Sequence, residues 1–267
     1  MVKVAITFVL VVNLLYVHSQ AGEVWHPVSL ALSNTVIAHR EAYYPSGNPA
    51  VLGGCANSQV GIATYCRFHI PELSTQALYG NLKTNQGGFG FFASYFGSKL
   101  YNQALFNLAY GHVLGKSLYG GIALRYNRYR VEALDETGRH LTGDVALLAR
   151  LTERVALALT CKNLNPWKEH SNNFPQNICL AVASGEKELY YASFQLELTD
   201  FSQVSASIGL EYRIVKVLAI RAGVTSGALQ NYSFGFGWRW NKLSLDLGFR
   251  QHPWLGLSTA VAVSYAI

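Results

Sequence analysis

The sequence predicts an all-β protein: a transmembrane antiparallel up-and-down β-barrel of about 14 strands with an N-terminal segment inside the lumen. Three observations lead to this fold class. Apolar and polar residues alternate along the second half of the chain, which is the period of a strand. Charged residues make up only 13% of the chain, against about 25% in an average soluble domain. Aromatic residues reach 13% and glycines number 24, a composition typical of an outer-membrane barrel.

The alternation is clearest near the C-terminus. In the segment 243–250, one face would carry Leu243, Leu245, Leu247 and Phe249, and the other Ser244, Asp246, Gly248 and Arg250. The segments 204–214, 232–240 and 257–267 repeat this pattern. A continuous apolar face opposite a face with charges is expected of a barrel wall that has lipid outside and a polar lumen inside.

Turn signals divide the chain after Ser58 into runs long enough for tilted membrane strands. Tight connections are expected at Arg154, 215–216 and 241–242, and we assign them to the periplasmic side. Longer connections are expected at 132–142, 164–176 and 227–231. The expected strands are 60–68, 75–82, 88–96, 102–114, 118–131, 143–151, 155–163, 177–183, 189–199, 204–214, 218–225, 232–240, 244–251 and 256–267.

The N-terminus predicts export. Lys3 precedes an apolar run that is too short for a membrane helix, and small polar residues follow it, so residues 1–20 are interpreted as a signal peptide. Residues 21–58 do not alternate and form an N-terminal hatch segment, with a short helix expected within 28–38. Residues 59–267 form the barrel. The cellular location that follows is the outer membrane of a Gram-negative bacterium, with outer-membrane lipids as surroundings.

Ten charged residues fall on the inward face of the expected strands. Charges away from water are costly unless paired, so we expect a structural ion-pair network; a cationic passage or ligand site is the alternative. Inward glycines such as Gly209, Gly223, Gly235 and Gly237 would leave room for the hatch. The charged residues are Arg125, Asp144, Arg150, Glu197, Glu211, Arg213, Arg221, Arg239, Asp246 and Arg250.

A short motif, Asn48-Pro49-Ala50 followed by Val51 and Leu52, stands just before the first expected strand. With the signal peptide, the non-alternating segment and about 14 strands, it resembles the outer-membrane family of the long-chain fatty-acid transporter FadL. The small size and short loops are similar to PorV/PorQ-type members, which are associated with the type IX secretion system. The resemblance implies that the N-terminal segment lies in the barrel as a hatch and that Asn48, Pro49 and Ala50 belong to it.

This resemblance implies an accessory or shuttle component of protein secretion, acting by binding rather than catalysis. Its partners would be a secretion translocon or a secreted cargo protein. The alternative is a FadL-like passive transporter of hydrophobic small molecules, whose partner would be a hydrophobic ligand. Both interpretations place the protein in the outer membrane and require no cofactor.

Other classes of function are disfavoured. We expect no enzyme: the best catalytic candidates, His140 and Asp144, would lie about 13 Å apart on a strand. No Cys-x-x-Cys spacing indicates a zinc site. Disulfides are conceivable for an exported protein with four cysteines, Cys55, Cys66, Cys161 and Cys179, although Cys161 and Cys179 would point to opposite faces. The net charge of +6 is spread singly along strands, so nucleic acid is not an expected partner.

Overall fold

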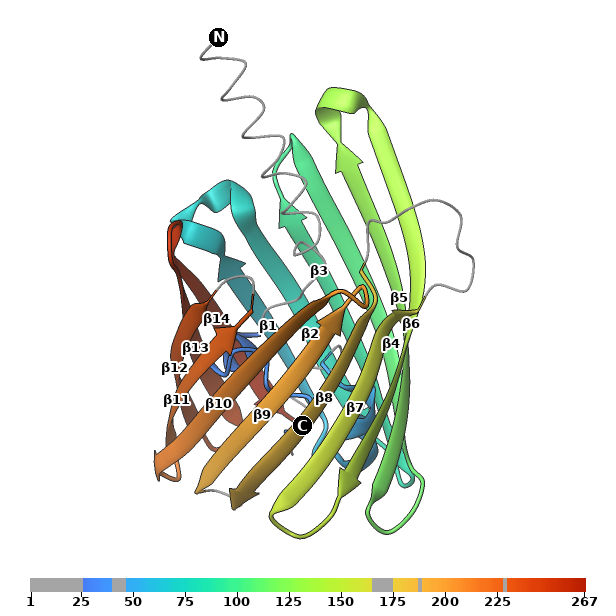
Figure 1. The fold of residues 1–267 in the computed structure, drawn as a ribbon, viewed down its shortest axis with the longest axis vertical. Coiled ribbons are helices and arrows are strands. Elements are labelled where there is room, and N and C mark those ends of the chain that lie inside the picture. The colour runs from blue at the N-terminus through green and yellow to red at the C-terminus, as the bar shows by residue number, and fades with distance from the viewer. Residues whose placement is uncertain (1–25, 40–46, 165–174, 187–188, 228–229) are drawn as a thin grey trace.

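The computed structural model describes residues 26–39, 47–164, 175–186, 189–227 and 230–267. Its fourteen strands form one closed antiparallel barrel in which each strand pairs with its neighbours in the chain and β1 closes on β14 (Figure 1). The predicted all-β architecture, an antiparallel up-and-down β-barrel of about 14 strands, is therefore confirmed. The signal peptide expected over 1–20 and most of the loop expected over 164–176 lie outside the described residues.

The strands follow the chain in order, and the closure pairs Val60 with Tyr265. They are β1 (Gln59–Cys66), β2 (Ser74–Lys83), β3 (Gly87–Gly97), β4 (Tyr101–Val113), β5 (Leu118–Val131), β6 (Glu136–Arg150), β7 (Val155–Leu164), β8 (Asn177–Glu186), β9 (Tyr190–Thr199), β10 (Gln203–Val215), β11 (Leu218–Ser226), β12 (Asn231–Trp240), β13 (Leu243–His252) and β14 (Gly256–Ala266).

The two rims of the barrel are distinguished by the ends of the sheet. β1 begins and β14 ends at one rim, which we call the terminal rim; the opposite one is the distal rim. The tight connections at 216–217 and 241–242 lie at the terminal rim because they follow even-numbered strands. We therefore expect the terminal rim to face the periplasm and the distal rim to face the cell exterior.

One predicted strand boundary differs from the structure by more than three residues. β6 begins at Glu136 rather than at residue 143, and its first residues pair with β5 from Val131 inwards. The β5–β6 hairpin therefore projects beyond the other strands at the distal rim (Figure 1). The stretch Glu136–His140 is polar on both faces, so alternation did not mark it as a strand. The short helix expected within 28–38 is α2 (Pro27–Ala31), and it ends before Ser33 and Asn34, which adopt left-handed φ angles of 51° and 67°.

The outer and inner faces of the barrel wall carry different kinds of side chain. Large apolar side chains of alternate residues are exposed on the outer face, including Ile62 and Ile122, both 61% exposed, and Leu108 at 66%. Their neighbours along each strand point into the lumen and are buried or half-buried. This division follows from the two-residue period of a strand. Among the described helices, none is long and apolar enough to cross a membrane.

Candidate functional site: a plugged lumen and a hollow in the wall

The lumen is occupied by the described part of the hatch, residues 26–39 and 47–58. Its two short helices are α2 and the 3-10 helix η1 (Pro49–Gly54). α2 packs against β11–β14, and η1 packs against β3–β6. Apolar side chains of the hatch, among them Val28, Leu32 and Leu52, form one buried cluster with luminal residues of the wall. The lumen is therefore filled by an apolar core as well as by charged groups.

The Asn-Pro-Ala motif begins η1. Asn48 is the N-cap residue, and its Oδ1 accepts a hydrogen bond from the backbone N–H of Ala50 at 2.9 Å. Its Nδ2 donates to the carbonyl oxygen of Ile37 in the other part of the hatch. Pro49 occupies the first turn, where a missing N–H costs nothing. The motif therefore both starts η1 and joins it to the segment that carries α2.

Glycines of the wall provide the surface on which η1 lies. Gly111 of β4 and Gly121 of β5 are cross-strand partners. A Cβ atom added at Gly111 would lie 2.4 Å from the carbonyl oxygen of Pro49, and one added at Gly121 would lie 2.2 Å from the nitrogen of Ala50. Only glycine permits such an approach of two backbones.

A second glycine pair receives the segment around α2. Gly209 of β10 and Gly223 of β11 are cross-strand partners. Added Cβ atoms would meet Thr35 and Leu32 at Gly209, and Leu32 and Ser33 at Gly223. Gly235 was expected on the inner face together with Gly209 and Gly223, and a Cβ atom added there would meet Ala31 in the same way. A Cβ atom added at Gly237 would instead meet the guanidinium of Arg221.

Four of the ten predicted luminal charges come together on the inner face of β10, β11 and β13. Arg221 of β11 donates from Nε to Glu211 of β10 and from Nη1 to Asp246 of β13, both at 2.6 Å. Arg213 lies 3.4 Å from the other carboxylate oxygen of Glu211. Arg221, Glu211 and Asp246 are all at least nine-tenths buried, so this is an ion-pair group with little access to water.

Of the other six charges, Arg239 lies beside this group, and the remaining five are distributed around the barrel. Arg125 pairs with Asp144 at 2.6 Å, and the second oxygen of Asp144 accepts from the backbone of Asn163. Arg150 stacks over the ring of Tyr119. For the rest, Glu197 accepts from Asn177, Arg250 donates to Asn34 of the hatch, and Arg239 lies beside Arg213 and Asp246. The ten residues therefore do not form one passage.

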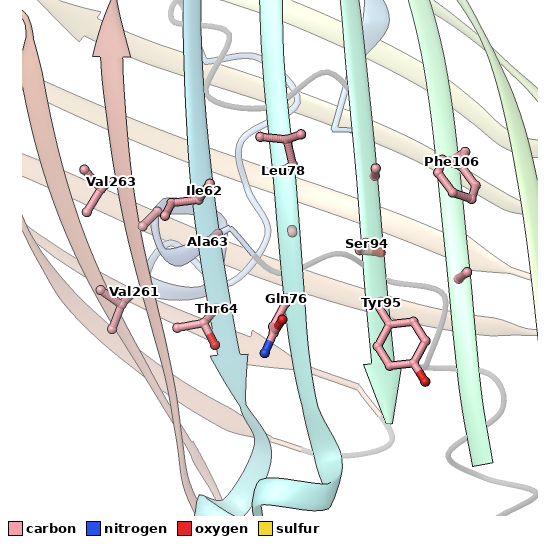
Figure 2. Close-up of a pocket in the computed structure, with 14 residues that line it drawn as sticks. Ile62, Ala63, Thr64, Gln76, Leu78, Ser94, Tyr95, Phe106, Val261 and Val263 are labelled. Carbon is pink, nitrogen blue, oxygen red and sulfur yellow. The ribbon is translucent and has the colours of Figure 1, made fainter. Parts of the chain in front are cut away.

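A hollow of about 650 Å³ lies in the wall where β14, β1, β2, β3 and β4 run side by side (Figure 2). Ile62, Leu78 and Phe106 stand around it on the outer face. Small residues form its floor, including Ala63, Ala77 and Ala262. Behind this sector, Tyr79, Phe92 and Leu105 form a buried cluster on the luminal side, with Ala63 and Ala77 packed against it.

The register of β2, β3 and β4 creates the hollow. In one row, Leu78 is opposite Ala93, which is opposite Phe106. In the next row, Tyr95 is opposite Ala104. Small outward side chains therefore fall between large ones on two neighbouring strands. Sequence reasoning missed this site because each strand alone shows ordinary alternation; the signal appears only when the strands are aligned by their pairing.

Catalytic and metal chemistry find little support in the geometry. Asp144, half of the best catalytic pair, is engaged by Arg125, and His140 stacks on Tyr129. Within the described residues, no group of three or more His, Cys, Asp or Glu side chains is placed to hold a metal ion. None of the four cysteines forms a disulfide, and Cys161 and Cys179 point to opposite faces of the wall, as their positions predicted.

Comparison with known proteins identifies the architecture. No family model matches the sequence, and no curated protein matches it. Solved structures, in contrast, match the fold of this chain. The FadL homologue of Pseudomonas aeruginosa has a TM-score of 0.70 at 9% identity, with 90% of this chain and 98% of that chain covered.

Two further barrels align over similar lengths. The monoaromatic hydrocarbon channel CymD gives a TM-score of 0.66 at 11% identity, with 90% of this chain and 97% of that chain covered. The toluene transporter TodX of Pseudomonas putida gives 0.65 at 11% identity, with 91% and 98% covered. These structural neighbours are outer-membrane barrels of the FadL family. At such low identity the likeness is one of fold.

Proposed function

We propose that this protein is an outer-membrane barrel that lets hydrophobic small molecules pass between the outer face of its wall and the lumen. The observation that carries this proposal is the apolar hollow of about 650 Å³ over β14 and β1–β4. An apolar molecule gains free energy in proportion to the apolar surface it buries. Residues such as Ile62, Leu78 and Phe106 offer that surface at the level of the strands.

The filled lumen supports the same function. The hatch occupies the interior with an apolar core and charged groups that bind one another, an arrangement unsuited to a wide aqueous channel. Behind the hollow the wall is built from Ala63, Ala77 and Ala262, and a cluster of Tyr79, Phe92 and Leu105 follows on the luminal side. An apolar solute would thus meet apolar groups on both sides of a thin sector of wall.

The comparisons favour this function over the secretion accessory that the small size implied. The neighbouring structures are a hydrocarbon channel, a toluene transporter and a FadL homologue, and none of the three is described as a secretion component. Monoaromatic hydrocarbons and long-chain fatty acids are accordingly the first solutes to test. A location in the outer membrane of a Gram-negative bacterium is part of the same proposal.

Filling the hollow tests the proposal. In A93F/A104F, two aromatic rings would occupy the space between the existing large side chains. We expect uptake of a radiolabelled monoaromatic hydrocarbon or long-chain fatty acid, in Gram-negative cells lacking other FadL-type barrels, to fall at least about fivefold, because the apolar surface for the solute is lost.

The matched control is A222F, which adds one ring at an exposed, outward-facing alanine of β11, away from the hollow. It should leave uptake near the wild-type level, and heat-resistant migration on gels should show that both variants fold. Equal uptake by A93F/A104F and wild type would overturn the role of the hollow. Absence of uptake of either solute class by the wild type would overturn the proposed function.

A further inference from the structure

We propose that the outer face of the β5–β6 hairpin binds the phosphate of an outer-leaflet membrane lipid through Arg128 and Arg139. The inference rests on the proposed outer-membrane location, but it concerns a surface that the passage of hydrophobic molecules does not use. It begins with an arrangement of charges that the fold itself leaves uncompensated.

Arg128 of β5 and Arg139 of β6 are direct cross-strand partners. Both are exposed, and both belong to the outward set of their strands, because their neighbours Asn127, Tyr129 and His140 point inward. Side chains directly opposite one another in an antiparallel pair lie close together, and like charges in that position destabilise the pair. The arrangement is favourable only when an anion lies between the two guanidinium groups.

No side chain of the described residues supplies that anion. The contrast with Arg130, the next outward residue of β5, is informative. Arg130 pairs with Glu132 at 3.1 Å and lies 3.8 Å from Asp135 in the hairpin connection. Within the part of the chain that the structure describes, neither Arg128 nor Arg139 has an acidic partner. The hairpin thus neutralises its outermost arginine and leaves a pair of positive charges just below it.

The surroundings of the pair indicate a lipid. Towards the terminal rim, the next outward residues are Tyr126 and Leu141, which are also cross-strand partners. Leu124 and Val145 follow, 53% and 45% exposed. The outer face of the hairpin therefore changes from apolar to an aromatic ring and then to two cations within about 13 Å along the strand. Aromatic rings take the headgroup level of a membrane, so the arginines stand at the level of lipid phosphates.

The chemistry of the two side chains selects phosphate. Guanidinium groups bind phosphate oxygens through paired N–H donors, with geometric specificity that an ammonium lacks. The distal rim is the one expected to face the cell exterior, so the lipid belongs to the outer leaflet. Its acyl chains would lie along the apolar outward side chains of β4, β5 and β6, among them Leu108 and Ile122, and its phosphate between Arg128 and Arg139.

Native mass spectrometry of the full chain in mild detergent tests this site. Lipid A, which carries phosphates and several acyl chains, is titrated against wild type and R128Q/R139Q, with dephosphorylated lipid A as the second ligand. We expect the wild type to bind the phosphorylated lipid and the double variant to bind it about tenfold more weakly, because two charge-assisted interactions are lost. The dephosphorylated lipid should bind both proteins equally weakly.

R130Q is the matched control, since it removes an outward arginine of the same strand that is already paired; it should bind like the wild type. Equal binding of the phosphorylated lipid by wild type and R128Q/R139Q would overturn the proposal, as would equal binding of the two lipids by the wild type. A site for free phosphate rather than lipid would be revealed if millimolar inorganic phosphate bound and displaced the lipid completely, and this too would overturn it. The readout does not involve uptake, so this proposal and the proposed function fail separately.

Discussion

His26 of the hatch donates a hydrogen bond from Nε2 to the hydroxyl oxygen of Tyr79 on β2, over 3.0 Å. The direction follows from the other ring nitrogen, because Nδ1 accepts from the backbone N–H of Val28 and therefore carries no proton. Both residues are almost completely buried. Tyr79 also belongs to the cluster behind the wall hollow, so this bond links the start of the hatch to the sector of wall proposed to receive the solute.

Acidification should loosen the hatch through His26. Burial, and after it the positive charge of Arg221, lowers the pKa of His26 from 6.5 to about 3. A histidine held neutral in the folded state contributes stability that is fully present above pH 6.5 and is lost as the pH falls from 6.5 towards 3. Hydrogen exchange of the segment 26–39, corrected for the intrinsic pH dependence, should therefore rise over this range.

The control for His26 is H26Q, whose amide can still donate to Tyr79 but does not titrate. Its hydrogen exchange in 26–39 should change much less with pH than that of the wild type. The same pH dependence in both proteins would mean that another group governs the loosening of the hatch.

Adding one methyl group at Gly121 should displace η1. A Cβ atom there would lie 2.2 Å from the nitrogen of Ala50, far closer than atoms can pack. Overpacking of this kind costs about 1–3 kcal/mol, so G121A should lower the thermal midpoint of the barrel, followed by heat-dependent migration on gels. Hydrogen exchange at 48–54 should increase as well.

Gly143 provides the comparison for Gly121. Its added Cβ would meet its nearest atoms only at 3.8 Å, which is an ordinary contact, so G143A should behave like the wild type. If G121A and G143A have the same thermal midpoint and the same hydrogen exchange in 48–54, the close approach of η1 to Gly121 is not what positions η1.

The barrel was predictable because one physical signal is repeated in nearly every strand. Alternation fixes which side chains face outward, and turn residues fix where strands end; β5, for example, has the predicted bounds Leu118–Val131. The start of β6 was missed for the same reason. At the projecting end of the hairpin both faces of β6 carry polar residues or glycine, so Glu136–His140 has no apolar face to alternate.

The site was predictable only in part. Parity places each of the ten charges on the inner face, but partners such as Arg221 and Asp246 are 25 residues apart and meet only through the pairing of β11, β12 and β13. The hollow is harder to predict from the sequence than the ion pairs, because Ala93 and Ala104 fit the ordinary alternation of their own strands. What sequence patterns lack is the register between strands, and both features depend on it.

Removing the side chain of Asn48 should separate the two parts of the hatch. Asn48 caps η1 through Ala50 and holds the carbonyl of Ile37, and it is 3% exposed. Loss of an N-cap costs about 0.5–2 kcal/mol, so N48A should increase hydrogen exchange both at 48–54 and near Ile37. N48D keeps the capping oxygen but cannot donate to Ile37, so it should affect mainly the second region. An N48A hatch that exchanges like the wild type would contradict the capping role.

Arg221 should be the most costly luminal residue to remove alone. It is 3% exposed and binds two buried carboxylates, Glu211 and Asp246. Breaking a buried ion pair by removing one partner costs about 3–5 kcal/mol, since the remaining charges lose their compensation. R221M should therefore lower the free energy of unfolding, measured by urea denaturation in lipid vesicles, by an amount of this order. The double variant R221M/D246N removes one charge of each sign and keeps the pair of Arg213 with Glu211, so it restores the charge balance and should recover most of that loss. If the double variant is as unstable as R221M, it is the packing of the guanidinium rather than its charge that holds β10, β11 and β13 together.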